Sequence, residues 1–250
     1  MAGLIVVLAL VGLVVERCTT TDDLAGPAEA GGTASGAVST ADDFASAPDG
    51  GSLGDGGGGA QAGESGDVAA ALAALEVLPA PTVAGQVPDY ERTDFLPGGW
   101  ADLDHDGCYS RNEILRRDLT DVTFEDGWCK VATGRLADPY SGQVIDFDKA
   151  VSTTTVQIDH VVPLAQAWRA GAWNWTKDQR IAFANDPAEL LAVSGPANQS
   201  KGDSGPAEWL PRTGQCPYAA AYALLAARYG LAIPQADRDT LHTVLAACPT

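Results

Sequence analysis

The chain has 250 residues and a formal net charge of −18, with 33 acidic and 15 basic side chains. An overall field of this sign does not steer a protein toward nucleic acid, so the composition excludes a basic, field-driven nucleic-acid binder. The charge is uneven: residues 87–250 carry 22 acidic and 14 basic side chains, and the rest of the acidic excess lies upstream.

The first 17 residues have the character of an export signal. Leu4 to Val15 is an unbroken apolar run, too short to span a bilayer comfortably but typical of the apolar segment of a signal peptide. No basic residue precedes it. We therefore assign residues 1–17 to a signal peptide or N-terminal anchor. Lipidation of Cys18 is an alternative, but Glu16 and Arg17 stand where small residues normally precede a lipidated cysteine.

Residues 18–86 have the composition of a linker. They are rich in Gly, Ala, Ser, Thr and Asp, contain Gly56 to Gly59 in succession, and have no Lys or Arg. Such a segment buries too little apolar surface to offset the entropy of ordering, so we predict a disordered linker. The Ala/Leu run from Val68 to Leu78 indicates at most a transient helix. Residues 87–250 are then one folded domain, long enough to form a core.

An acidic loop opens the folded part. Oxygen-bearing side chains occupy positions one, three, five, nine and twelve of a loop with Gly107 at position six, the pattern of a calcium-binding EF-hand loop: Asp102, Asp104, Asp106, Ser110 and Glu113. A helix is predicted after it, over Arg111 to Leu119. Pro97, Gly98 and Gly99 break the helix that would normally precede it. The alternative interpretation is an acidic turn at a helix N-terminus.

Strand patterns follow the acidic loop. The segments from Trp128 to Leu136 and from Gln143 to Phe147 predict a hairpin, and Thr153 to Ile158 alternates β-branched residues as a strand does. We expect the hairpin to extend the sheet that contains this strand. Between Leu164 and Ala184 the pattern is helical, with Thr176 and Gln179 as a capping box.

The strand from Thr153 to Ile158 ends in Asp159 and His160. A second apolar strand is predicted from Glu189 to Val193, and Ala197 to Lys201 predicts one or two helical turns that carry Asn198. Two strands and a short helix with polar groups on each form a ββα unit. We expect those polar groups to converge, with a bend after His160 that lets Asp159 and His160 serve one site.

Four cysteines lie in the folded part, and four cysteines allow three pairings. Helical patterns from Cys216 to Tyr229 and from Pro234 onward predict an antiparallel helix pair, in which the start of the first helix lies beside the end of the second. This geometry favours the pair Cys216–Cys248 and leaves Cys108–Cys129. Paired cysteines indicate an oxidising compartment and leave little basis for a thiol hydrolase.

The polar residues of the ββα unit fit phosphodiester hydrolysis. His160 titrates in the range needed for a base that activates water. Asp159 and Asn198 offer oxygen ligands for Mg²⁺ or Mn²⁺, which keep much of their hydration shell. Lys201 lies three residues after Asn198 on the same helical face and is a candidate phosphate contact, as is Arg180.

The ordered set IDHVVPL, FANDPAELLAV, NQSKGD and WLP resembles the HNH endonucleases of the ββα-metal class, and in particular the exported branch that resembles the C-terminal domain of GmrSD-type restriction enzymes. DGCYSRNEILRRDL and DPYSGQVIDF also resemble that branch. The resemblance implies that Asp159 and Asn198 bind the metal and that His160 is the general base. It departs at Glu189, where the family has an Asn that orders the loop holding the base, so a carboxylate would do so only by accepting hydrogen bonds.

We therefore expect an α+β fold: a ββα-metal nuclease core with flanking helices, a β-hairpin and a C-terminal helical hairpin, stapled by disulfides. The expected function is that of a monomeric, secreted or cell-surface endonuclease that cleaves DNA, with RNA as an alternative substrate, using one divalent metal ion and no small-molecule cofactor. The alternative is a calcium-stabilised cell-surface binding module whose nuclease site has decayed.

Overall fold

The computed structural model describes residues 60–81 and 87–249. The expected export signal, Cys18 and most of the predicted linker lie outside these residues. The described part is an α+β fold with two small sheets, helices around them and two disulfides, as predicted. None of the helices within it is long and apolar enough to cross a membrane.

A three-stranded antiparallel sheet forms the first β structure of the domain. Helix α2 (Ser110–Asp118) leads directly into β1 (Leu119–Phe124), which pairs with β2 (Val131–Ala137), and β2 pairs with β3 (Val144–Asp148). The predicted helix and hairpin are confirmed. β1 was not predicted, because Asp121 has a φ of +52° and the register shifts beside it, so the alternation that marks a strand is interrupted.

The second sheet contains the predicted ββα unit. β4 (Val156–His160) pairs antiparallel with β5 (Leu190–Ser194), and α5 (Gly195–Lys201) follows β5 at once. The Ser194 hydroxyl accepts a hydrogen bond from the Ala197 N–H and caps the helix. One face of this pair packs with α2 in a core that includes Val156, Ile158, Leu190 and Ala192.

The two sheets remain separate, so the expectation that the hairpin extends the sheet of Asp159 and His160 is wrong. The outer edge of β5 is covered by side chains instead of a strand. Asp118 accepts from the Ala192 N–H at 2.8 Å and Asp138 accepts from the Ser194 N–H at 2.9 Å, while Arg117 donates to the Leu190 carbonyl at 2.7 Å. These bonds satisfy the polar groups that a further strand would have paired.

Helices form the rest of the domain. The 3₁₀ turn η1 (Arg92–Asp94) precedes the acidic loop. Between β4 and β5 lie α3 (Leu164–Arg169), the 3₁₀ turn η2 (Ala172–Asn174) and α4 (Lys177–Ala184), and α4 begins with the predicted capping box of Thr176 and Gln179. The chain closes with α6 (Gln215–Arg228) and α7 (Gln235–Ala246).

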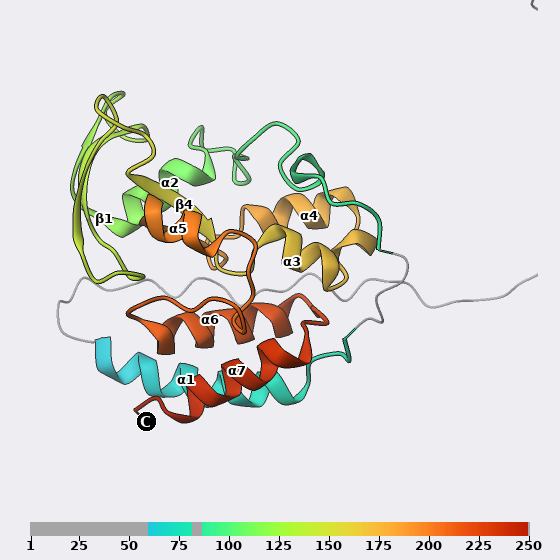
Figure 1. Ribbon diagram of the computed structural model, residues 1–250. Coiled ribbons are helices and arrows are strands. Elements are labelled where there is room, and N and C mark those ends of the chain that lie inside the picture. The colour runs from blue at the N-terminus through green and yellow to red at the C-terminus, as the bar shows by residue number, and fades with distance from the viewer. Residues whose placement is uncertain (1–59, 82–86, 250) are drawn as a thin grey trace, which may run out of the picture. The chain divides into compact units, whose positions relative to one another are not determined.

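The helix α1 (Ala60–Glu76) lies inside the segment predicted to be a disordered linker, and that prediction is wrong for this part. Val68, Ala71 and Leu75 are buried, and α1 packs against α6 and α7, as Figure 1 shows. Arg238 of α7 also donates to the Leu78 carbonyl at 3.2 Å. Ala is the best helix former, so a run of Ala and Leu needs only an apolar partner surface to become a stable helix.

Both predicted disulfides are confirmed. Cys216 at the start of α6 is bonded to Cys248 just after α7, and Cys108 in the acidic loop is bonded to Cys129 before β2. The first bond closes the helical hairpin. The second ties the acidic loop to the three-stranded sheet.

Candidate active site

A cavity of about 350 Å³ lies along the edge of β4 that no strand of residues 60–81 and 87–249 covers. Four consecutive β4 residues line it together with residues of α5 and of the segment around η1. The polar and charged members of the lining are Tyr90, Arg92, Gln157, Asp159, His160, Asn198, Gln199 and Asp203. The structure therefore brings the predicted residues Asp159, His160 and Asn198 to one cavity.

Two side chains of helix α5 form hydrogen bonds with two side chains of strand β4. Asn198 and Lys201 are three residues apart on one helical face, and Gln157 and Asp159 are two apart on one strand face. Asn198 Nδ2 donates to Gln157 Oε1 at 2.9 Å, and Lys201 Nζ donates to Asp159 Oδ2 at 2.6 Å. The first bond fixes the orientation of the Asn198 amide. Its Oδ1 has no hydrogen-bond partner among the described residues.

Asp159 is held by one of its two carboxylate oxygens. Its Oδ2 accepts from Lys201 Nζ and from the Tyr140 hydroxyl, both at 2.6 Å. Burial, followed by the charge of Asp159, raises the pKa of Tyr140 well above its usual range, so the hydroxyl stays a donor. The other oxygen, Oδ1, receives no hydrogen bond from the described residues. It is the oxygen left to bind a cation.

His160 leaves β4 on the face opposite Asp159, because the strand continues through His160 and bends only afterwards. The bend expected after His160 is present at Val161 and Val162, and Asp159 and His160 both line the cavity. The imidazole is stacked on Trp100, with the ring centroids 5.6 Å apart and the planes at 8°. This contact fixes the plane of the ring.

The hydrogen bonds of His160 define its tautomer. Nε2 lies 2.9 Å from the Ala184 carbonyl oxygen, which only accepts, so Nε2 must carry a proton. Burial lowers the pKa of His160 to about 3, below the range that the sequence led us to expect for the base, and the ring is neutral at neutral pH. A neutral ring protonated on Nε2 has its lone pair on Nδ1. Nδ1 has no hydrogen-bond partner among the described residues and is the atom able to accept a proton.

Glu189 holds the loop that follows His160. Its side chain is completely buried, and Oε1 accepts from the Val162 N–H at 2.9 Å, while the Glu189 carbonyl accepts from the Val161 N–H at 2.8 Å. Burial raises the pKa of Glu189 well above its usual range, against the opposing charge of Lys201. A neutral carboxyl group has one carbonyl oxygen and one O–H donor, much as an amide group has one oxygen and one NH₂ donor.

This similarity leads to a prediction for Glu189. Glu189→Gln is expected to keep catalytic activity within a few-fold of the wild type, because the amide still accepts from the Val162 N–H. Glu189→Ala is expected to lose 10–100-fold, the usual effect of removing a group that orients a catalytic residue. Initial cleavage rates of the three proteins check this. Equal losses in the Gln and Ala variants would show that the negative charge, and not the hydrogen bond, matters at this position.

The predicted phosphate contacts through Lys201 and Arg180 do not fit the structure. Lys201 is 1% exposed, and its ammonium donates to Asp159 Oδ2 and to the carbonyls of His160 and Val161 at 2.6, 2.6 and 3.1 Å. An ammonium has three N–H donors, so none remains for a phosphate. Arg180 donates to the carbonyls of Asp94 and Trp175 and does not line the cavity. Spacing along a helix shows which residues share a face but not whether that face is buried.

The sequence interpretation also missed the residues contributed from upstream. Tyr90 and Arg92 line the cavity, and Trp100 stacks on His160. These residues precede the ββα unit by more than fifty positions in the sequence. The aromatic residues Tyr90, Phe95 and Trp100, spaced around a single arginine before the acidic loop, were the signal that could have drawn attention to them.

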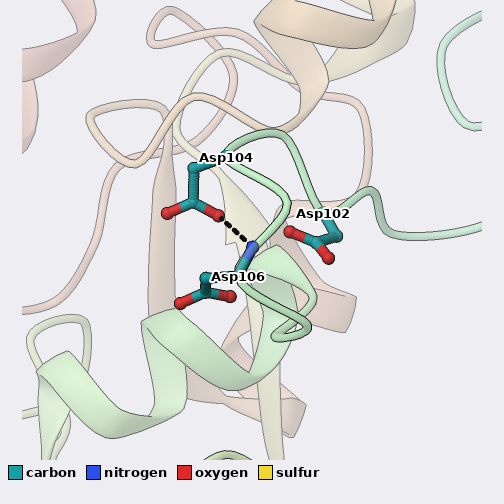
Figure 2. Close-up of side chains that lie close together, drawn as sticks. All are labelled: Asp102, Asp104 and Asp106. Carbon is teal, nitrogen blue, oxygen red and sulfur yellow. Dashed lines mark hydrogen bonds between the residues drawn. The ribbon is translucent and has the colours of Figure 1, made fainter.

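The predicted calcium loop brings three carboxylates together. Side-chain oxygens of Asp102, Asp104 and Asp106 lie within 4.8 Å of one another, and Figure 2 shows the three side chains around the same turn. Gly107, at φ +92°, donates its N–H to Asp102 Oδ2 at 2.9 Å, while Asp102 Oδ1 is buried without a hydrogen-bond partner among the described residues.

Glu113 and Ser110, the other two residues of the predicted loop, differ in their surroundings. Burial, followed by the charges of Asp104, Asp106 and Asp102, raises the pKa of Glu113. Ser110 is buried at the start of α2, and its hydroxyl lies 2.6 Å from the Ala101 carbonyl and 2.8 Å from Asn185 Oδ1. Ser110 thus fastens the loop to the segment that carries Ala184 and does not contribute to the carboxylate cluster.

The geometry defines a ββα unit with a carboxylate, an imidazole and an amide around one cavity. Residues 109–222 match the family of the GmrSD restriction endonucleases, C-terminal domain. An uncharacterized secreted protein from Arthroderma benhamiae is 38% identical over 145 residues, which cover 56% of this chain and 68% of that protein. No solved structure matches the chain. The chain belongs to the GmrSD C-terminal domain family, and its function is nuclease-related.

The location of the protein follows from the same comparison and from the cysteines. The relative from Arthroderma benhamiae is a secreted protein, and both disulfides of this chain require an oxidising environment to form and persist. The protein is exported.

Proposed function

We propose that this protein is an exported, metal-dependent endonuclease of the HNH type that hydrolyses phosphodiester bonds of DNA. One observation supports this above the others. Asp159, His160 and Asn198 line one cavity, and each has an acceptor atom with no hydrogen-bond partner among the described residues. Two such atoms are oxygens suited to a cation and the third is a nitrogen suited to a proton.

The donor set fits a single hard divalent cation. Asp159 Oδ1 and Asn198 Oδ1 are the oxygens that would bind it, and Mg²⁺ and Mn²⁺ favour a few protein oxygens with the remaining positions taken by water and phosphate. When bound, the ion supplies positive charge to the phosphate oxygens. Lys201 and Tyr140 hold the other Asp159 oxygen, so the carboxylate would use one oxygen for the ion.

His160 is the general base of the proposed reaction. Nδ1 accepts the proton of the attacking water, and the Nε2–H bond to the Ala184 carbonyl keeps the correct tautomer and stabilises the imidazolium that results. Trp100 and the Glu189-bonded loop restrict the ring and the backbone around it. A base fixed in this way loses little entropy when the reaction begins.

Metal dependence tests this proposal directly. Purified protein is expected to nick and linearise plasmid DNA with Mg²⁺ or Mn²⁺ and to stop when EDTA removes the ion. Asp159→Asn and Asn198→Ala are expected to lower the rate at limiting metal by 10-fold or more, and excess metal should restore part of the loss in Asn198→Ala. An RNA substrate measured in parallel defines the substrate range. Cleavage that persists in EDTA would contradict the metal-dependent mechanism.

A second candidate function is a calcium-stabilised binding module, which the cluster of Asp102, Asp104 and Asp106 favours. In this case the acidic loop binds Ca²⁺ and the cavity beside β4 has no catalytic role. Calorimetry separates the two candidates. Tight Ca²⁺ binding that Asp104→Asn abolishes, with no Mg²⁺-dependent cleavage, would support the module. Both functions are compatible if Ca²⁺ binds the loop and Mg²⁺ supports cleavage.

A further inference from the structure

The candidate site needs a cationic side chain for the phosphate, and the two predicted from the sequence, Lys201 and Arg180, form hydrogen bonds to other groups. Lys201 uses its donors on Asp159 and two carbonyls, and Arg180 donates to two carbonyls outside the cavity. Asp159 and Asp203 both line the cavity and carry negative charge. A phosphodiester entering such a site needs positive charge from the protein as well as from the metal.

Among the described residues, Arg92 is the one lysine or arginine that lines the cavity. Its side chain is exposed, and it forms no ion pair with any described residue. It lies beside Tyr90, whose pKa is raised by burial and whose rise Arg92 opposes. Arg92 therefore lines the cavity without an ion-pair partner among the described residues.

The backbone that carries Arg92 is fixed although its side chain is exposed. Arg180 Nε donates to the Asp94 carbonyl at 3.2 Å, and Trp168 Nε1 donates to the Pro88 carbonyl at 2.7 Å. Phe95, directly after η1, is completely buried against Trp168. Helices α3 and α4 thus hold the η1 segment against the open edge of β4. A fixed backbone under a long cationic side chain is an arrangement suited to binding an anion.

We propose that Arg92 binds the scissile phosphate and is a catalytic residue of this site. The planar guanidinium presents paired N–H donors that match two phosphate oxygens, a geometry that a lysine does not offer. This inference rests on the proposed nuclease function. Arg92 lies outside residues 109–222, which match the family, so the active site combines the ββα unit with an upstream segment.

Substitution of Arg92, with cleavage of a minimal substrate, tests the assignment. Arg92→Ala is expected to lower kcat for both plasmid DNA and bis(p-nitrophenyl) phosphate by roughly 10²-fold, since a donor aimed at transition-state charge has effects of this size. Arg92→Lys should recover only part of the rate. Arg135→Ala, which removes the same charge from the exposed pair with Asp146, is the matched control and should cleave as the wild type does.

The outcomes separate this inference from the proposed function. Wild type that cleaves neither substrate with any divalent metal contradicts the nuclease. Wild type that cleaves, with Arg92→Ala cleaving at the same kcat, overturns the role of Arg92 alone. A higher KM on DNA with unchanged kcat on the minimal diester places Arg92 at a flanking phosphate and contradicts the scissile position.

A binding measurement tests Arg92 independently of turnover. In the His160→Ala background, the affinity for a duplex oligonucleotide is measured over a range of salt concentrations with Mg²⁺ present. Adding Arg92→Ala should make the slope of log Kobs against log salt shallower by about 0.9, the value for one phosphate contact. Arg135→Ala should leave the slope unchanged. An unchanged slope in Arg92→Ala would overturn the inference.

Discussion

Replacing His160 with alanine is expected to lower the rate of DNA cleavage by roughly 10²–10⁴-fold, the usual contribution of a positioned general base. The reason is specific to one atom. Nε2 is protonated because it donates to the Ala184 carbonyl, so Nδ1 is the atom proposed to take the proton, and no other described imidazole lines the cavity. Initial rates on plasmid DNA with saturating Mg²⁺ give the effect on kcat.

A matched control makes this result interpretable. His242 is exposed on α7, remote from the cavity lining, and His242→Ala should cleave at the wild-type rate. Because His160 is buried against Trp100, the thermal unfolding midpoint of His160→Ala is measured as well, and rates are compared at a temperature at which both proteins are folded. A folded His160→Ala protein with wild-type activity would exclude His160 as the base.

Lys201→Met is expected to destabilise the protein by about 3–5 kcal/mol, the cost of leaving one partner of a buried ion pair without the other. The Lys201 side chain is fully shielded from solvent and that of Asp159 is 6% exposed. Removal of the ammonium also leaves the His160 and Val161 carbonyls, at the end of β4, without their hydrogen bonds to Lys201. Urea unfolding measures the loss, and a lower Mg²⁺ affinity should accompany it because Asp159 is no longer oriented.

Arg135→Met is the control for Lys201→Met. Arg135 and Asp146 form an ion pair at 3.1 Å, but their side chains are 55% and 84% exposed. Exposed pairs contribute about 0–1 kcal/mol, so this variant should unfold close to the wild type. If both variants lost the same stability, burial would not be the source of the Lys201 effect.

Local patterns were sufficient to predict most of the ββα unit. The β-branched alternation before Asp159, the apolar run after Glu189 and the helical pattern from Ala197 to Lys201 mark β4, β5 and α5, and each is within a few residues of the predicted position. The cysteine pairing also followed from helix geometry. These features depend on neighbours in sequence or on a single antiparallel contact.

Contacts between distant segments could not be predicted in the same way. The separation of the two sheets depends on Asp118 and Asp138 reaching the edge of β5, and no local pattern indicates that an aspartate will replace a strand. The stability of α1 likewise depends on the apolar faces of α6 and α7. The composition of α1 alone does not distinguish it from a linker.

The candidate site shows the same limit at the level of single side chains. Asn198 and Lys201 share a helical face, but one faces Gln157 at the cavity and the other is buried on Asp159. Arg92 and Trp100 reach the site from an upstream segment with no strand or helix pattern that links it to β4. Residue type and spacing indicated the proposed base and the candidate ligands, whereas the groups around them depend on contacts between distant segments.

The measurement that tests the central claim most directly is the location of Mn²⁺ by anomalous diffraction from crystals of the protein grown with that ion and without Ca²⁺. We predict one ion in the cavity beside β4, coordinated by Asp159 Oδ1 and Asn198 Oδ1, with Nδ1 of His160 facing its hydration shell. Anomalous density confined to the carboxylates of Asp102, Asp104 and Asp106, with none at Asp159, would contradict a metal-dependent nuclease site.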